Sequence, residues 1–545
     1  MFPPKARLFF YVCAVVFLLS SYFLLLAIDR RFGIDAPVAG GSMTEGVVGT
    51  LRFINPVLAF SEPDKDLTAL VYSGLLRATE NGYEPDLAEK YTVSEDGKVY
   101  TITLAEDRHF HDQTLVTVKD VLFTLNLIKD DRTKSPLGPS WAGISVESTD
   151  ERTIVLTLDR PYAPVLENLT VGILPEHIWK SVRPEEMLFS SRNLEAIGSG
   201  PYEVRSVTRS ASGIPQEVTL RSFNAGNKKP YISKLSIRIF ASEDDVLNAF
   251  VRHNIDATAR ISPLRAKELS DKGFEIHSIQ LPRIFATFFN PKHNAALAHL
   301  EVRQALDQAI DRNAIIDNVL GGFGTPLAGP FSTSTDQETG PEIAKNTLLK
   351  AGWQLGTDGI FEKTVGGKKE SLVFELHTSN APELVATAEL LKNMWRAAGI
   401  AVTPKFFETG DLNQQSIRAR NYDMLLFGEY QGRFPDPYAF WHSSQRDDPG
   451  LNVAMYSSKE ADTLLEKIRL DIDHEIRERD YTSLDTLIKT DIPAVFLYSP
   501  NLVYAFNQPV LGKILTPGTA PDRFLSVQDW YVRTDRIWSI FTSND

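Results

Sequence analysis

The chain has 545 residues, 43% of them hydrophobic and 23% charged, so it is an ordinary folded protein too long for one hydrophobic core, and two to four domains are expected. Its 57 Lys and Arg against 70 Asp and Glu give a formal net charge of −13, which disfavours a nucleic-acid partner because such a partner requires a basic surface. The single cysteine, Cys13, excludes thiolate metal sites and internal disulfides from the rest of the chain.

The N-terminal region predicts a membrane anchor. Residues 8–28 carry no charge and, at about 1.5 Å per helical residue, span roughly 31 Å, the thickness of the bilayer hydrocarbon. A secretory signal is the alternative, but its apolar part is normally only about 7–15 residues long, and no good cleavage site follows. We therefore expect residues 8–28 to contact the lipid bilayer, after a short cytoplasmic end over residues 1–7. Residues 35–50 are rich in Gly and small residues and are predicted to be flexible, and the linker itself is assigned to residues 29–43.

Two patterns predict regular elements in the next part of the chain. In residues 91–104, apolar side chains alternate with threonines, and Asp96-Gly97 supplies the turn of a hairpin. Thr117, with Asp120 three residues later, is a capping-box-like helix start, followed by apolar residues at helical spacing.

The segment RHFHDQ, residues 108–113, raises the question of a metal site. Residues two apart in a strand face the same side, so His109 and His111 could converge on an ion, with Asp112 beside them. No other cluster of His or carboxylates follows at ligand spacing, so we predict no metal.

Catalytic signatures are absent from the sequence. It contains no nucleophile elbow, no H-E-x-x-H and no phosphate-binding glycine loop. In GSGPY, residues 198–202, Pro201 removes a backbone donor that a phosphate cradle would use, so a tight turn into a strand is predicted instead. We do not expect an enzyme, and no cofactor is indicated.

The second half of the chain mixes helices with hairpins. Residues 301–322 carry one apolar stripe at helical spacing, ended by Gly321-Gly322. A hairpin is predicted over residues 359–377, and a helix over residues 384–399 precedes a further strand. Because hairpins interrupt any strict strand-helix alternation, the predicted class is mixed α/β and α+β, in more than one lobe.

Several segments, taken in order, carry a family resemblance. They are PDLAEKYTVSEDGKVYTITLAEDRHFHDQTLVTVKDVLFTL, GSGPYEV, LEVRQALDQAIDRNAIIDNVLGGFGTPLAGPF, IAKNTLLKAGW and NYDMLLFGEYQGRFPDPYAFWHSS. Together they closely resemble the peptide-type extracytoplasmic solute-binding proteins of ABC importers, the oligopeptide, dipeptide and nickel group. The resemblance covers roughly residues 47–531.

The resemblance implies a two-lobed, three-domain fold of the periplasmic-binding-protein type, with a cleft that closes at a hinge. Lobe I would be discontinuous, the extra domain II would be inserted within it, and lobe III would lie opposite. Their predicted bounds are residues 44–75, 197–284 and 498–545 for lobe I, 76–196 for domain II and 285–497 for lobe III.

The resemblance also places the segment GEYQGRFPDP at the cleft. Family members that hold a free peptide amino terminus have an acidic residue where this chain has Arg433, and a guanidinium cannot pair with an amine because both only donate. Arg433 would suit a carboxylate, a phosphate or a carbonyl, or would neutralise Glu429. Asp436 is either a ligand anchor or, before Pro437, a helix N-cap. The candidate ligand-binding residues are Arg433, Tyr430, Phe434, Asp436, Phe60, Ser61, Arg283 and Phe285, with Tyr430 either stacking on the ligand or packing in the core.

Two classes of function follow from these features. The first is a membrane-anchored, extracytoplasmic solute-binding component of an ABC importer, which captures a peptide or similarly extended solute and delivers it to the permease. The alternative is a surface binding, chaperone or sensor protein that keeps the fold without transport. A nickel chelate or a sugar stays open as the ligand, because fold does not fix function.

Overall fold

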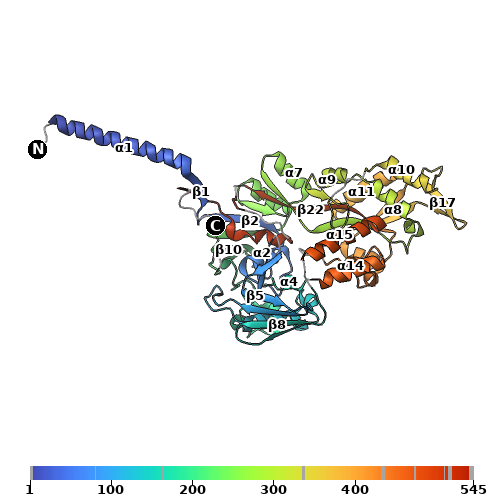
Figure 1. Cartoon of the computed structure of the whole chain (residues 1–545), viewed down its shortest axis with the longest axis horizontal. Coiled ribbons are helices and arrows are strands. Elements are labelled where there is room, and N and C mark those ends of the chain that lie inside the picture. The colour runs from blue at the N-terminus through green and yellow to red at the C-terminus, as the bar shows by residue number, and fades with distance from the viewer. Residues whose placement is uncertain are drawn as a thin grey trace.

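The computed structural model describes residues 4–79, 82–162, 164–226, 228–333, 338–430, 436–471, 474–507, 510–512 and 518–538. Its main feature is a 12-stranded sheet that runs through the body of the molecule (Figure 1). In spatial order the strands are β20 (Ala401–Phe407), β19 (Val373–Ser379), β21 (Met424–Tyr430), β14 (Arg283–Phe289), β22 (Ala494–Phe506), β12 (Ala257–Ala259), β2 (Ser42–Val48), β11 (Lys234–Phe240), β10 (Pro215–Ser222) and β9 (Tyr202–Arg209); β13 (Glu275–Gln280) and β15 (Gly324–Pro326) also pair with β22.

The long strand β22 connects two halves of this sheet. Near its start it pairs with β14, and near its end it pairs with β12 and β13. We call β12, β2, β11, β10 and β9, with the helices packed on them, the α2 half. The strands β20, β19, β21 and β14, with their helices, are the β21 half. The division of the chain into three domains at the predicted bounds stays a prediction.

Each half carries its own helices. The α2 half has α2 (Glu62–Val71), α6 (Glu243–Val251) and α7 (Pro263–Asp271). The β21 half has α8 (Leu300–Gln308), α9 (Arg312–Val319), α10 (Pro341–Lys350), α11 (Pro382–Ala397), α14 (Lys459–Leu470) and α15 (His474–Asp491). Short helices elsewhere are α4 (Val165–Asn168), α5 (Glu176–Trp179), α12 (Thr409–Asp411) and α13 (Tyr438–Trp441).

Smaller sheets surround the main one. Four antiparallel strands, β5 (Ala88–Val93), β6 (Val99–Leu104), β8 (Thr153–Leu158) and β7 (Ile144–Ser148), form a separate sheet beside α3 (Val118–Lys129). Two-stranded and three-stranded ribbons consist of β3 (Leu76–Thr79) with β4 (Gly82–Pro85), and β16 (Gln354–Leu355) with β17 (Phe361–Val365) and β18 (Lys368–Ser371). These sheets confirm both predicted hairpins, and the mixed α/β and α+β class is confirmed with them.

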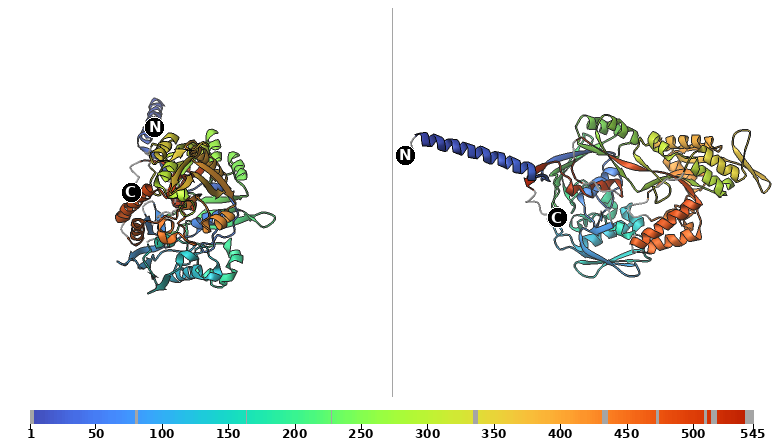
Figure 2. Two further views of the ribbon diagram at one scale, coloured as in Figure 1. Left: turned by 90° about the vertical axis from the view of Figure 1, so that its right-hand side faces the viewer. Right: turned by 45° about the horizontal axis from the view of Figure 1, so that its top comes forward.

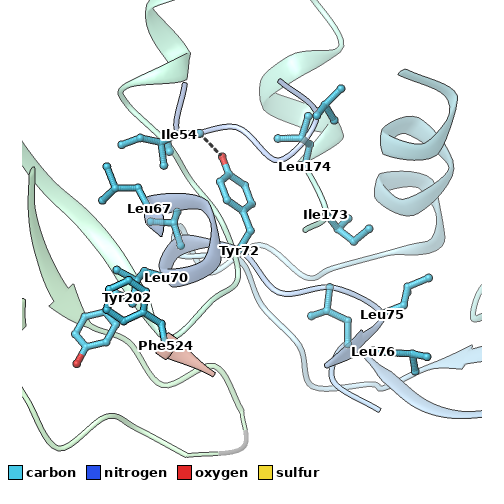
Figure 3. Close-up of a cluster of buried hydrophobic side chains, with 14 of the residues drawn as sticks. Ile54, Leu67, Leu70, Tyr72, Leu75, Leu76, Ile173, Leu174, Tyr202 and Phe524 are labelled. Atoms are coloured by element: carbon cyan, nitrogen blue, oxygen red, sulfur yellow. Dashed lines mark hydrogen bonds between the residues drawn. The ribbon is translucent and has the colours of Figure 1, made fainter. Parts of the chain in front are cut away.

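The hydrophobic core is continuous beneath α2 (Figure 3). Leu67 and Leu70 of α2 belong to the same buried cluster as Ile173, Leu174 and Phe524, which come from distant parts of the sequence, and Tyr72 lies between the two sides. The same core continues into the four-stranded sheet, so the α2 half and that sheet are held together by apolar burial. In the β21 half, separate cores lie on the two faces of β14 and β21.

The N-terminal helix α1 (Pro4–Phe32) leads away from the body, as Figures 1 and 2 show. It is followed directly by β1 (Gly33–Pro37), which pairs with the C-terminal strand β23 (Thr534–Trp538). Over residues 35–50 the expected flexible linker is therefore wrong, since β1 and β2 occupy much of it. Among the residues whose side chains are described, no helix is both long and apolar enough to cross a membrane.

One predicted helix is divided in two. The apolar stripe over residues 301–322 predicted a single helix, but α8 ends at Gln308 and α9 begins at Arg312. The Asp311 side chain accepts a hydrogen bond from the backbone N–H of Ala314 at 3.0 Å and caps α9. A strong N-cap residue therefore overrides a periodicity that continues past it.

Candidate functional site

A cavity of about 690 Å³ lies where the two halves approach each other. This volume is within the roughly 300–1,000 Å³ that is typical of small-molecule sites. The α2 half contributes residues of α2 and the segment 519–522, while the β21 half contributes Tyr430. A third wall comes from the region of β3–β8 and α4. The lining side chains with polar or aromatic chemistry are Glu62, Lys65, Thr68, Tyr72, Tyr83, Ser140, Trp141, Tyr162, Glu167, Asn168, Thr170, Arg283, Tyr430, Thr519 and Asp522.

Tyr430 lies at the end of β21 and reaches across the cavity. Its hydroxyl donates a 2.6 Å hydrogen bond to the carbonyl oxygen of Gly518, in the α2 half. The side chain lines the cavity and is 41% exposed, so it is not a core residue. Of the two interpretations open for Tyr430, core packing is thus wrong.

Arg283 and Phe285 lie on β14, the strand that pairs with β21 beside Tyr430. Arg283 lines the cavity, whereas Phe285 packs against the core. Arg283 is the register partner of Tyr430. Phe285 instead lies over Gly428 and stacks on Tyr498, with ring centroids 5.2 Å apart. It packs against the core on that face of the sheet and is not among the cavity-lining residues.

Ser61 and Phe60 lie at the start of α2, beside the cavity wall. The hydroxyl of Ser61 accepts a hydrogen bond from the N–H of Asp64 and donates one to the carbonyl of Thr50, so Ser61 is the N-cap of α2. Phe60 is 76% exposed, next to the lining residue Ala59. The structure therefore gives Ser61 a positioning role for α2 and leaves the Phe60 ring at the surface.

Asp436 does not cap a helix. The short helix α13 has Pro437 at its N-cap position, without a side-chain hydrogen bond. The carboxylate of Asp436 instead accepts hydrogen bonds from Arg469 of α14 at 2.5–3.2 Å. The Arg469 guanidinium lies 4.2 Å from the ring centroid of Tyr438 and 5.4 Å from that of Tyr162. The N-cap interpretation is therefore wrong, and Asp436 belongs to an ion pair stacked on aromatic rings beside the cavity.

Arg433 and Phe434 fall outside the described residues, which end at Tyr430 and resume at Asp436. Their proposed place at the cleft stays a prediction.

Glu429 is a buried acid that the sequence analysis considered only as a partner for Arg433. It is 2% exposed, and neither carboxylate oxygen has a hydrogen-bond partner among the described residues. Burial raises the pKa of this carboxyl well above its usual range. Side chains alternate along a strand, so Glu429 lies on the face of β21 opposite to Tyr430, the face that carries Leu425 and Phe427. The uncharged acid form is favoured there.

The RHFHDQ segment has a structural role in the described fold. His111 Nδ1 accepts from the N–H of Gly198 at 3.2 Å, and Nε2 lies 3.1 Å from the carbonyl of Gly200. Burial lowers the pKa of His111 to about 4, which keeps the ring neutral for this pairing. In the part of the chain that the structure describes, no cluster of His, Cys, Asp or Glu could hold a metal ion. The predicted tight turn at GSGPY leads into β9 at Tyr202.

Most of the cavity wall was not predicted from the sequence. Lys65 of α2, Trp141 and Tyr162 all line it, yet Lys65 is far from the other two in the sequence. Neither α2 nor these aromatic residues carries a motif that marks a ligand site. Only the fold brings them together.

Comparisons with known proteins define the class. Residues 82–451 match the model of the bacterial extracellular solute-binding proteins, family 5. This match covers more than half of the chain, which therefore belongs to that family. The resemblance seen in the sequence is confirmed, and the fold is that of a solute-binding protein.

Individual members of this family are similar to the chain in sequence and in structure. The oligopeptide-binding protein AppA of Bacillus subtilis is 26% identical over 499 residues, covering 85% of this chain and 87% of AppA. The solved structure of AppA with a nonapeptide has a TM-score of 0.66 at 24% identity and covers 91% of this chain and 100% of that chain. NikZ of Campylobacter jejuni, solved with Ni(L-His), has a TM-score of 0.67 at 28% identity and covers 90% of this chain and 99% of that one.

Proposed function

We propose that this protein is the solute-binding component of an ABC importer, and that it captures a peptide or a similarly extended solute between the α2 half and the β21 half. The observation that carries this proposal is the cavity of about 690 Å³ lined from both halves. Family membership supports it, because AppA is solved with a nonapeptide and NikZ with Ni(L-His), and this chain matches both over nearly their whole length. Binding would close the halves around the solute, which is then delivered to a permease.

The residues proposed to contact the solute are those of the cavity, together with Arg433 and Phe434. Tyr430 and Arg283 line the cavity, and Arg433 and Phe434 would extend its wall. Tyrosine rings offer apolar area with a polar tip, and arginine offers paired donors for carboxylates or carbonyls. This mixture suits the repeated carbonyls and varied side chains of a peptide better than a small sugar.

We also propose that the N-terminal helix holds the protein at the cell membrane, with the binding domain outside. The uncharged run over residues 8–28 supports the anchor, as does the direction of α1, away from the body (Figure 2). Its described apolar side chains are exposed, with Phe9 at 71% and Phe17 at 69%.

Mass spectrometry of small molecules that co-purify with the full chain in detergent tests the proposed function. Denaturation should release a peptide or another extended solute in near-stoichiometric amount. Release of a nickel chelate would redirect the ligand class within the same family. Absence of any solute, together with no binding of a randomised nonapeptide pool, would favour the alternative of a surface protein without transport.

A further inference from the structure

The segment 518–524 is one part of the α2 half that meets the β21 half. Its Gly518 carbonyl accepts the hydrogen bond from Tyr430, and its residues 519–522 line the cavity. The segment is therefore both a wall of the cavity and the acceptor of a contact that exists only when the two halves are close.

A fully buried arginine fixes this segment. Arg523 is 0% exposed and donates to both oxygens of the Asp66 carboxylate of α2, at 2.7 and 2.8 Å. It also donates to Glu45 of β2, at 2.6 and 3.0 Å. A further hydrogen bond of 2.9 Å reaches the carbonyl of Ala520, within the segment itself. One side chain thus joins the segment to α2, which lines the cavity, and to β2 of the main sheet.

The surroundings of Arg523 make this arrangement stiff. Tyr504 donates to Glu45, and Arg260 donates to Asp66, so both carboxylates have further partners. The guanidinium lies 4.0 Å from the ring centroid of Phe524, which packs in the core beneath α2 (Figure 3). Arg260 also lies 3.2 Å from Glu62, so two arginines face three acids. A planar guanidinium in two-sided contact permits little displacement.

We propose that Arg523 is a positioning residue for closure of the cavity: it holds the segment 518–524 so that the Gly518 carbonyl meets the Tyr430 hydroxyl of the opposite half. Arg523 is not among the residues that line the cavity, so its effect on the solute is indirect. The proposal rests on the proposed function, in which the two halves close around a solute. It adds the residue that determines how stable the closed state is.

Arg260 supplies a matched control. Like Arg523 it donates two hydrogen bonds to Asp66, but its other ionic partner is Glu62 of α2 and not a residue of the segment 518–524. A lysine at either position keeps the positive charge and loses the paired geometry. If the buried charges merely stabilised the fold, Arg260→Lys and Arg523→Lys would affect closure alike.

The experiment uses two spin labels to measure the distance between the β21 half and the region of α3, which the shared core joins to the α2 half. They are attached at Lys119→Cys on α3 and Lys467→Cys on α14, both exposed, in a Cys13→Ser background of the full chain in detergent. Distance distributions are recorded with and without a randomised nonapeptide pool.

Because a single hydrogen bond is involved, Tyr430→Phe should lower the ratio of closed to open molecules about two- to tenfold. Arg523→Lys should lower this ratio to a similar extent, whereas Arg260→Lys should leave it unchanged. The double variant Tyr430→Phe with Arg523→Lys should be no more open than Tyr430→Phe alone.

Several results would overturn the proposal. These are distributions unchanged by Tyr430→Phe, equal opening by Arg260→Lys and Arg523→Lys, or additive opening in the double variant. If circular dichroism shows that Arg523→Lys does not fold, Asp522→Ala replaces it. Asp522 accepts a hydrogen bond from the N–H of Thr519 and so shapes the same segment. The proposal then requires that Asp522→Ala lowers the ratio of closed to open molecules. If adding the peptide pool does not change the distance distribution of wild type, the result counts against the proposed function. The ratio of closed to open molecules in the variants, measured without peptide, still tests the role of Arg523.

Discussion

At the scale of single residues, Glu429 combines deep burial with a carboxyl that has no partner among the described residues. Such a group lowers the stability of the empty protein, and it is typical of sites where function constrains the sequence. Glu429→Leu should therefore raise the free energy of unfolding by about 1–3 kcal/mol, measured by denaturant titration. The matched variant Glu429→Gln keeps an unsatisfied polar group and should gain less.

The pH dependence follows from the raised pKa of Glu429. Below the ordinary pKa of glutamate the carboxyl is protonated in both folded and unfolded chains. As the pH rises through that value, the unfolded chain loses its proton while the folded chain keeps it, so wild type loses stability until the folded pKa is reached. The advantage of Glu429→Leu should accordingly be larger at pH 7 than at pH 4. An advantage that shrinks as the pH rises would contradict this account.

Arg433 is proposed to bind the solute at the cavity. A hydrogen bond to a charged group contributes about 1.5–3 kcal/mol, so Arg433→Ala should weaken binding of a nonapeptide pool roughly 10- to 150-fold. The thermal midpoint of the empty protein should not fall. Arg209→Ala, at an exposed position of β9, serves as control. Affinities within twofold for wild type and both variants would show that Arg433 is not a ligand contact.

Local residue patterns predicted some side-chain roles and missed others. The capping box of Thr117 and Asp120 is present, because both partners lie within one turn of helix. The Asp-Pro pattern at Asp436 predicted a cap, but its carboxylate pairs with Arg469, 33 residues further on. Tertiary ion pairs of this kind leave no trace in a local pattern.

At the scale of secondary-structure elements, the break between α8 and α9 depends on the cap at Asp311. Asp311→Ala should lower the free energy of unfolding by about 0.5–2 kcal/mol, since it leaves a helix N-terminal N–H without its acceptor. Asp311→Ser retains an acceptor and should lose much less. Equal losses for both variants in denaturant titrations would mean that the cap is not what stabilises α9.

Strands and hairpins were predicted better than helix ends. The hairpin turning at Asp96-Gly97 and the one over residues 359–377 are both present, because alternation and turn residues are local signals. Apolar spacing alone did not reveal the break before α9. The strand β1 was missed because its partner β23 lies at the far end of the chain.

At the scale of the whole molecule, the ordered series of family segments predicted the fold class, but not the residues of the cavity. The walls come from α2, from the region of Trp141 and Tyr162 and from the segment 519–522. The shared core and the ion pairs of Arg523 bring these together. A resemblance in sequence therefore indicates the class of protein, while the ligand chemistry requires the assembled structure.

The proposed anchor has its own test. Amino-terminal sequencing of the mature protein should find residues 8–28 still attached, and the protein should be recovered with the membrane fraction. Treatment with a high-salt wash should not release it, because apolar insertion is not screened by salt. A soluble chain that begins near Ala36 would mean that the segment is a cleaved signal.

The central claim is that an extended solute binds in the cavity between the two halves. Native mass spectrometry of the full chain with a randomised nonapeptide pool tests it most directly, in wild type and in two tryptophan variants. Ala69→Trp places a large ring on the exposed, cavity-lining face of α2, whereas Ser270→Trp adds the same ring at an exposed position of α7, outside the cavity. We predict that wild type and Ser270→Trp retain peptide and that Ala69→Trp loses it by at least about tenfold, an effect of about 1.4 kcal/mol. Equal retention by all three proteins, or by none, would contradict the account.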